Sequence, residues 1–134
     1  MKVIIATIAL ALLTAVGASA QDLRSTQKIY VGEMGQSDEA ARFRILLGDE
    51  LTKAGFTVVD SVSKADATLS GIMTVRVYDD SSIARATVSL TSSDGVRLWG
   101  KDFEPRAHFG RGSDTVRFRA QDIAKNLRKE HNKK

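Results

Sequence analysis

The sequence predicts an α+β fold: a two-layer sandwich in which two helices cover one face of a mostly antiparallel sheet, in the order β-α-β-β-β-β-α. Three consecutive segments between residues 67 and 104 alternate apolar and polar residues with a period of two, which is typical of strands with one covered and one solvated face. Two other segments each carry one apolar stripe at helical spacing. Each helix must bury its stripe against another layer, and the half-buried sheet supplies that layer.

The first strand and the first helix come early in the predicted domain. Residues 28–34 are rich in β-type side chains and are predicted to form a strand. Ser37 is placed to cap a helix, and Asp38 and Glu39 follow in the first turn, where negative charge suits the helix dipole. The apolar stripe spans an arc of about 80° and consists of Ala40, Phe43, Leu47, Leu51 and Ala54. Gly55 is expected to end the helix in a left-handed conformation.

Two residues of this helix have no evident part in the predicted fold. Gly48 costs roughly 1 kcal/mol relative to alanine inside a helix, and the sequence offers no reason for it beyond close packing. Ile45 lies on the opposite side of the helical wheel from the apolar stripe. It is interpreted as an ordinary surface residue unless a partner covers it.

The remaining strands are predicted at 56–60, 67–78, 84–91 and 96–104, with a polar loop over 61–66. Turns are predicted at 79–82 and 92–95, where Asp, Ser and Gly cluster. In the last strand, Arg97 and Trp99 are expected to point outward. The residues expected to face the helices are Ala67, Leu69, Gly71, Met73, Val75, Val77, Ala84, Ala86, Val88, Leu90, Val96 and Leu98.

A basic, glycine-containing connection is predicted over residues 105–112, after which Ser113 or Asp114 caps the last helix. The apolar stripe of that helix consists of Val116, Ala120, Ile123, Ala124 and Leu127. Fraying is expected from residue 130 onward, so that residues 131–134 form a loose tail. The interior enclosed by these elements is expected to be purely apolar.

The first twenty residues have the three parts of a secretory signal: a charged start at Lys2, an apolar run from Val3 to Val16, and small residues before Gln21. Cleavage is expected after Ala20, leaving one domain of 114 residues at 21–134. The alternative, an uncleaved anchor, is disfavoured because the run is shorter than the about 20 apolar residues of a membrane span. The mature protein is therefore expected in the periplasm or outside the cell, without a span.

Composition narrows the function classes. The chain contains no cysteine, which excludes a disulfide framework, a thiolate metal site, a cysteine nucleophile and a lipid-modified cysteine. Residues 21–96 carry a net charge of −3, whereas residues 97–134 carry +6. This asymmetry indicates an acidic partner, an anionic polymer or an anionic membrane face; the alternative is a solvated helix and tail.

Two short motifs resemble those of known envelope domains. Residues 64–71, KADATLSG, resemble the segment that opens a strand in the curli-secretion lipoprotein, the penicillin-binding-protein activator lipoprotein and the amino-terminal part of the Tol-Pal β-propeller protein. Residues 91–99, TSSDGVRLW, resemble a hairpin of the same domains. The resemblance implies a non-enzymatic role in protein–protein contacts. The chain departs from the two lipoproteins because it lacks their anchoring cysteine.

A search for catalytic patterns predicts no enzyme, no cofactor and no metal site. His108 and His131 lack the further ligands that a zinc site needs at defined spacing. The segment Gly110–Asp114 lacks the pattern of a hydrolase serine and the lysine of a phosphate loop. Asp79 and Asp80 are interpreted as turn residues rather than as paired catalytic acids.

Two sets of residues remain as candidates for binding. Arg106 and Arg111 are placed to hold an anion at the start of the last helix, with a solvated loop as the alternative. A basic face with one aromatic residue is predicted on the last helix, for docking to an acidic partner or an anionic glycan; its residues are Arg117, Phe118, Lys125, Arg128 and Lys129. The alternative is that Phe118 folds down onto the helix start or onto the preceding connection.

The function predicted from these observations is a non-catalytic periplasmic accessory module that acts through contacts with another envelope protein. An alternative is a binder of an anionic polymer, such as an acidic glycan, through the basic carboxyl-terminal third, with an affinity that falls steeply with salt. Nucleic acid is disfavoured as that polymer because export takes the chain away from it. An enzyme is a third hypothesis, which activity lost on substitution of Asp79, Asp80, Asp94 or His108 would support.

Overall fold

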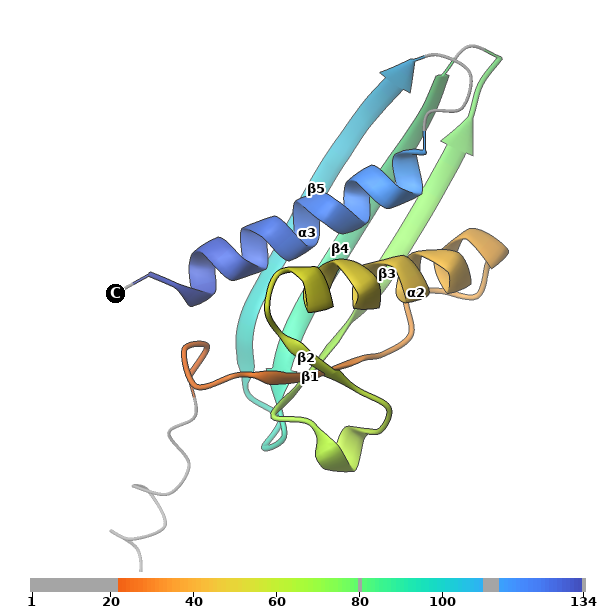
Figure 1. Ribbon diagram of the computed structural model, residues 1–134. Helices are drawn as coiled ribbons and strands as arrows, with labels where there is room; N and C mark the ends of the chain where they lie inside the picture. The colour runs from red at the N-terminus through yellow and green to blue at the C-terminus, as the bar shows by residue number, and fades with distance from the viewer. Residues whose placement is uncertain (1–21, 80, 110–113, 134) are drawn as a thin grey trace, which may run out of the picture.

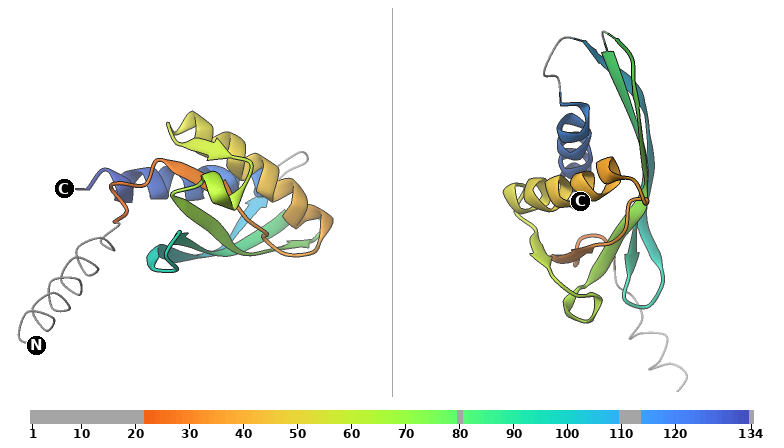
Figure 2. Two further views of the ribbon diagram at one scale, coloured as in Figure 1. Left: turned by 90° about the horizontal axis from the view of Figure 1, so that it is seen from below. Right: turned by 90° about the vertical axis from the view of Figure 1, so that its right-hand side faces the viewer.

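The computed structural model describes residues 22–79, 81–109 and 114–133, and these form the predicted α+β sandwich (Figure 1). Both helices lie on the same face of a five-stranded sheet, and none of the described residues forms a helix on the other face (Figure 2). The elements are β1 (Lys28–Val31), α2 (Asp38–Lys53), β2 (Thr57–Val59), the short 3₁₀ turn η1 (Val62–Lys64), β3 (Ala67–Val77), β4 (Ser81–Ser92), β5 (Arg97–Phe109) and α3 (Thr115–His131). The predicted signal peptide and its cleavage after Ala20 lie outside the described residues.

The sheet is mixed, with strand order β2-β1-β3-β4-β5. β1 pairs in parallel with both β2 and β3, whereas β3, β4 and β5 form an antiparallel meander. Parallel neighbours need a crossover connection, and α2 supplies the one between β1 and β2. The short β2 and the long β5 are therefore the two edges of the sheet.

The core lies between the sheet and the two helices, as the stripes predict. Phe43 and Leu47 of α2 and Ile123 and Leu127 of α3 are fully buried. α2 packs on β1, β2 and β3, and α3 packs on β4 and β5. The caps of α2 also agree with the sequence, because the Ser37 side chain accepts from the Ala40 N–H and Gly55 has a φ of 99°.

The face taken by Trp99 differs from the sequence prediction. Trp99 lies opposite Leu90, which is fully buried, and it packs against the core cluster. The cause is a register shift: Thr91 pairs with Arg97 but Leu90 pairs with Trp99, so Leu98 is an extra residue. Such a bulge reverses the alternation beyond it. Val96, expected inward, is correspondingly at the turn and exposed.

The connection predicted over residues 105–112 begins later, because β5 continues through Phe109. A second register shift, from Ala86–Phe103 to Ala84–Arg106, places two residues of β5 opposite the single residue Arg85. Pro105 is one of these two. An edge strand at a bulge is where a sheet tolerates proline, since its missing N–H leaves no ladder bond broken.

The sequence predicted a purely apolar interior, and this prediction is wrong. Arg119 of α3 lies in the interior and is only 5% exposed. Its guanidinium donates to the carbonyl oxygens of Ala84 (2.9 Å) and Glu104 (2.7 Å), which lie on the two strands at the second bulge. A buried charge needs such partners. The carbonyl groups at the bulge therefore allow the arginine to be buried, and its hydrogen bonds join α3 to β4 and β5.

The predicted loose tail is ordered at its start. α3 includes His131, whose Nε2 donates to the carbonyl oxygen of Thr26 at 2.9 Å. The His131 ring also meets the Phe56 ring edge-on, with centroids 5.2 Å apart. These contacts hold the end of α3 against the segments that precede β1 and β2. Fraying is expected only beyond this point.

Candidate binding groove

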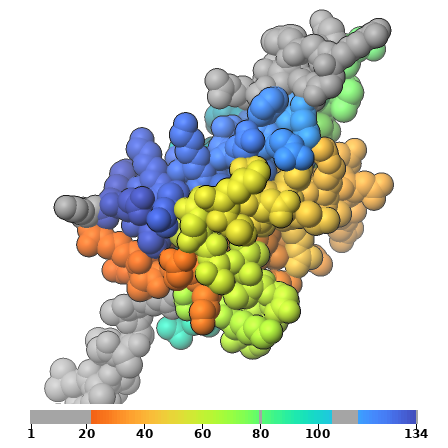
Figure 3. All heavy atoms as spheres, viewed as in Figure 1, coloured from red at the N-terminus to blue at the C-terminus, as the bar shows by residue number. Residues whose placement is uncertain are grey.

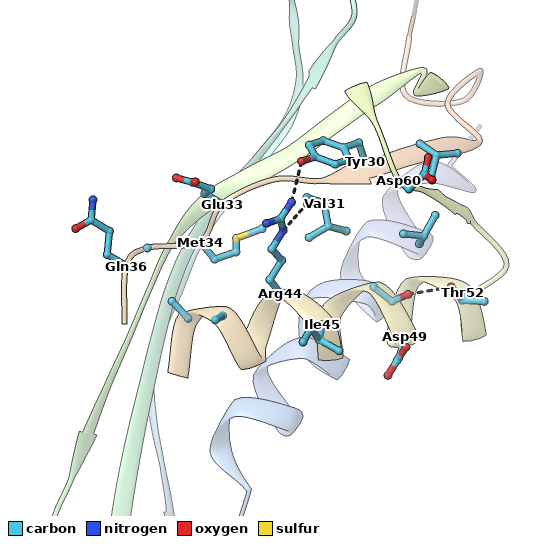
Figure 4. A pocket seen from close by; sticks show the side chains of 16 residues that line it. Tyr30, Val31, Glu33, Met34, Gln36, Arg44, Ile45, Asp49, Thr52 and Asp60 are labelled. Carbon is cyan, nitrogen blue, oxygen red and sulfur yellow. Dashed lines mark hydrogen bonds between the residues drawn. The ribbon is translucent and has the colours of Figure 1, made fainter. Parts of the chain in front are cut away.

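A hollow of about 830 Å³ runs along one side of α2 (Figure 4). Its opposite wall is formed by residues of β1 and β2, and its end by the connection between β1 and α2. We call this hollow the α2 groove. The contact between α2 and α3 involves Arg42, which pairs with Asp114, and Arg42 does not line the groove. In Figure 3, α3, α2 and the segment around β2 follow one another across the same side of the molecule.

The Arg44 side chain is fixed inside the groove. Its Nε donates to the carbonyl oxygen of Val31 and its terminal nitrogen to the hydroxyl of Tyr30, both at 2.8 Å. The guanidinium carbon lies 5.5 Å from the centre of the Tyr30 ring, within the range of a cation–π contact. Figure 4 shows the arginine reaching from the helix across to β1. Two of its donor nitrogens are therefore already hydrogen-bonded to the groove wall.

The charge of the groove is negative. Three exposed carboxylates line it, those of Glu33, Asp49 and Asp60, against the single guanidinium of Arg44. Asp60 pairs with Lys64 at 3.0 Å, on the surface. Within the described part of the chain, Glu33 and Asp49 have no cation at ion-pair distance. The field at the groove thus favours a cationic or neutral occupant.

Ile45 and Gly48 lie on the groove side of α2. Ile45 is 68% exposed. A Cβ on Gly48 would meet only Val58 Cγ1, at 3.8 Å, which is ordinary van der Waals contact. Close packing within this chain therefore does not require the glycine, contrary to the one reason that the sequence suggested.

Gly48→Ala should raise the free energy of unfolding by about 0.5–1 kcal/mol, because alanine is the better helix former and the site has room for its methyl group. Urea unfolding followed by circular dichroism measures the change. A loss of stability would mean that the helix needs the glycine for its own packing. A matched Gly71→Ala control should be strongly destabilising, since its Cβ would lie 2.0 Å from the Thr87 carbonyl oxygen.

The carboxyl groups with lowered pKa values hold the fold together outside the groove. The Arg42 side chain lowers the pKa of Asp114, which also accepts from the Arg117 N–H and so caps α3. On the sheet face that the helices do not cover, hydrogen bonds from Arg85 of β4 and, to a lesser extent, from Thr87 lower the pKa of Asp102 of β5. In the described ranges no three histidine or acidic side chains gather as they would around a metal ion.

The basic face predicted on α3 is only partly assembled. Lys125 and Lys129 are exposed and, among the described residues, have no ion-pair partner, and Phe118 beside them is 40% exposed. Arg117 is close to Asp114, at 3.5 Å. Arg128 does not join this face, because its guanidinium lies over the Phe56 ring, 5.4 Å from the centroid. We call Phe118, Lys125 and Lys129 the α3 face.

The predicted anion site is not assembled by the described residues. Arg106 lies in β5 opposite Ala84, rather than in a loop at the start of α3. Arg111 lies outside the described residues. The role of both arginines in anion binding remains a prediction.

Sequence reasoning missed the α2 groove, although it named two of its residues. Ile45 and Gly48 are the places where the helix departs from what stability favours, which is a signal of function. The wall formed by Tyr30 and Val58 could not be foreseen, because it requires the chain to return through α2 so that β2 pairs with β1.

Comparisons with known proteins identify the fold. No family model matches the sequence, and no curated protein matches it. Among solved structures, the PelC dodecamer from Paraburkholderia phytofirmans superposes with a TM-score of 0.60 and 16% sequence identity, covering 83% of this chain and 91% of that chain. A minor lipoprotein from Acinetobacter baumannii superposes with a TM-score of 0.51 and 9% identity, covering 78% and 94%.

These similarities show that the chain has the same fold as PelC and a bacterial lipoprotein. At such identities they show the fold alone. The particular families that residues 64–71 and 91–99 resemble remain a prediction. Neither α2 nor α3 has the length and apolar character of a helix that crosses a membrane.

Proposed function

We propose that this chain is a non-catalytic module of the bacterial cell envelope that acts through protein–protein contacts. Three observations support the proposal: the secretory pattern of residues 1–20, a fold shared with a bacterial lipoprotein, and a groove with an exposed apolar rim. The observation that carries it is the α2 groove. The exposed Ile45 and the unexplained Gly48 of this groove add nothing to the core, but they allow a partner to approach the helix closely.

The alternative, binding of an anionic polymer through residues 97–134, is weakened by how the arginines there are used. Arg119 is buried and Arg128 stacks on Phe56. Lys133 pairs with Glu130, and Arg117 is close to Asp114. Much of the positive charge of this segment therefore has partners within the fold. The groove is itself negative and would repel such a polymer.

Mild crosslinking in intact cells, followed by purification of the chain, tests the proposal. We expect discrete crosslinked species, reduced about fivefold or more by Ile45→Ser or Phe118→Ser, with little change in thermal stability because both side chains are exposed. The matched control is Ile72→Ser on the bare sheet face, where the side chain is 64% exposed.

Two outcomes would count against the proposal. One is repeated recovery of the wild-type chain as an uncrosslinked monomer. The other is equal loss of crosslinking in Ile72→Ser and in the two test variants. A collapse of stability in Phe118→Ser would show that this residue belongs to the core instead.

A further inference from the structure

The outward side of α2 carries a second stripe, opposite the one that packs on the sheet. Ala41, Ile45, Gly48 and Thr52 fall within an arc of about 60° at 100° per residue, and all four line the α2 groove. Two of the four have little or no side chain, so another helix can approach the backbone closely here. Ile45, at 68% exposure, is the apolar surface that such an approach would cover.

The α3 face has the complementary character. Phe118, Lys125 and Lys129 fall within an arc of about 40° on the side of α3 away from the core. The two lysines have no ion-pair partner among the described residues, and the Phe118 ring, nearer the start of the same side of α3, is 40% exposed. The face thus combines an apolar side chain with free positive charge.

The α2 groove carries the negative charge that would complement the lysines of the α3 face. Glu33 and Asp49 at the groove are exposed and, in the described ranges, have no cationic partner. The groove and the α3 face cannot meet within one molecule, because α2 lies between them (Figure 3). They can meet only between two molecules.

Resting on the proposed function, we propose that the partner is a second copy of this chain, whose α3 face docks into the α2 groove of the first. Phe118 covers Ile45 and approaches Gly48, Lys125 faces the carboxylate of Asp49, and Lys129 adds positive charge beside the negative groove. The two surfaces in this contact differ, so a pair of bound copies still leaves one groove and one α3 face open. Such head-to-tail contacts extend into a ring or a filament rather than stopping at a symmetric dimer.

Sedimentation velocity of the full chain tests this, with protein from about 1 to 500 μM. We expect the mean mass to rise with concentration beyond that of a dimer, and the association to weaken as salt is raised, because the paired charges are near the surface. Asp49→Lys and Lys125→Glu should each raise the dissociation constant about tenfold or more. Asp94→Lys, which makes the same charge change at the β4–β5 turn, is the matched control.

Mixing the two variants gives the decisive measurement. The two substitutions exchange the charges of one pair, so both contacts between unlike variants again join opposite charges. The mixture should therefore regain the association that each variant alone has lost, with the two variants alternating. A wild-type chain that remains monomeric at every concentration overturns the proposal, as does association unaffected by both variants or a mixture of the two variants that associates no better than either variant alone. Crosslinking to a different protein that depends on Ile45, in a chain that stays monomeric, would leave the proposed function standing and refute only the second copy.

Discussion

Arg119→Ala should lower the free energy of unfolding by about 3 kcal/mol, the largest loss that we expect from any single side chain outside the apolar core. The guanidinium satisfies the carbonyl oxygens of Ala84 and Glu104 and lies 3.5 Å from the carboxylate of Asp122. It also lies over the Phe103 ring, 5.8 Å from the centroid. Removing it leaves two buried acceptors without a donor and a hollow between α3 and the sheet.

Urea unfolding curves measure this loss, and two further variants separate its causes. Arg119→Met fills much of the same volume without donors, so we expect an intermediate loss of about 2 kcal/mol if hydrogen bonds dominate. Arg117→Ala, on the exposed side of the same helix, should change stability by less than about 0.5 kcal/mol. If Arg119→Met were as stable as the wild type, the hydrogen bonds at the bulge would contribute nothing net.

The reason that Arg119 escaped prediction lies in the sheet rather than in the helix. On the wheel Arg119 borders the apolar stripe, where a long basic side chain ordinarily extends to solvent. Its burial depends on the bulge at Arg85, which turns carbonyl groups of β4 and β5 toward α3. A register shift adds one residue to one strand and leaves the apolar–polar pattern of each strand readable by itself. The pattern therefore predicted the strands but not how they are offset.

Local signals predicted most of the fold because they are short-range. The stripes of α2 and α3, the Ser37 cap and the turn at Gly95 each depend on a few neighbouring residues. The predicted face of Trp99 and the predicted length of β5 were wrong for the same reason. Both depend on the bulges between β4 and β5. The α2 groove required the pairing of β1 with β2, which no local pattern specifies. Its only trace in the sequence was Ile45 and Gly48, two residues that the core does not use.

Asp66→Ala is expected to lower the free energy of unfolding by about 2–3 kcal/mol, although the side chain is near the surface. The Asp66 carboxylate accepts from the backbone N–H of Gln27 (2.9 Å) and of Lys28 (2.8 Å), and its own N–H donates to the Lys28 carbonyl oxygen. Its carbonyl oxygen accepts from the Ser93 N–H in the β4–β5 hairpin. One residue thus joins the start of β1, the entry of β3 and the hairpin. This accounts physically for the aspartate in the segment KADATLSG.

The pH dependence of stability gives the same prediction a second, independent measurement. The Lys28 N–H lowers the pKa of Asp66 below its ordinary value of 3.8. A carboxyl group whose pKa is lower in the folded state stabilises the fold above its unfolded pKa, and that contribution is lost as the pH falls through the folded pKa. Asp66→Asn carries no charge at any pH, so its deficit relative to the wild type should be full near pH 7 and should shrink below about pH 4. A deficit that stayed constant down to pH 3 would mean that the shape of the side chain, and not its charge, holds β1 to β3.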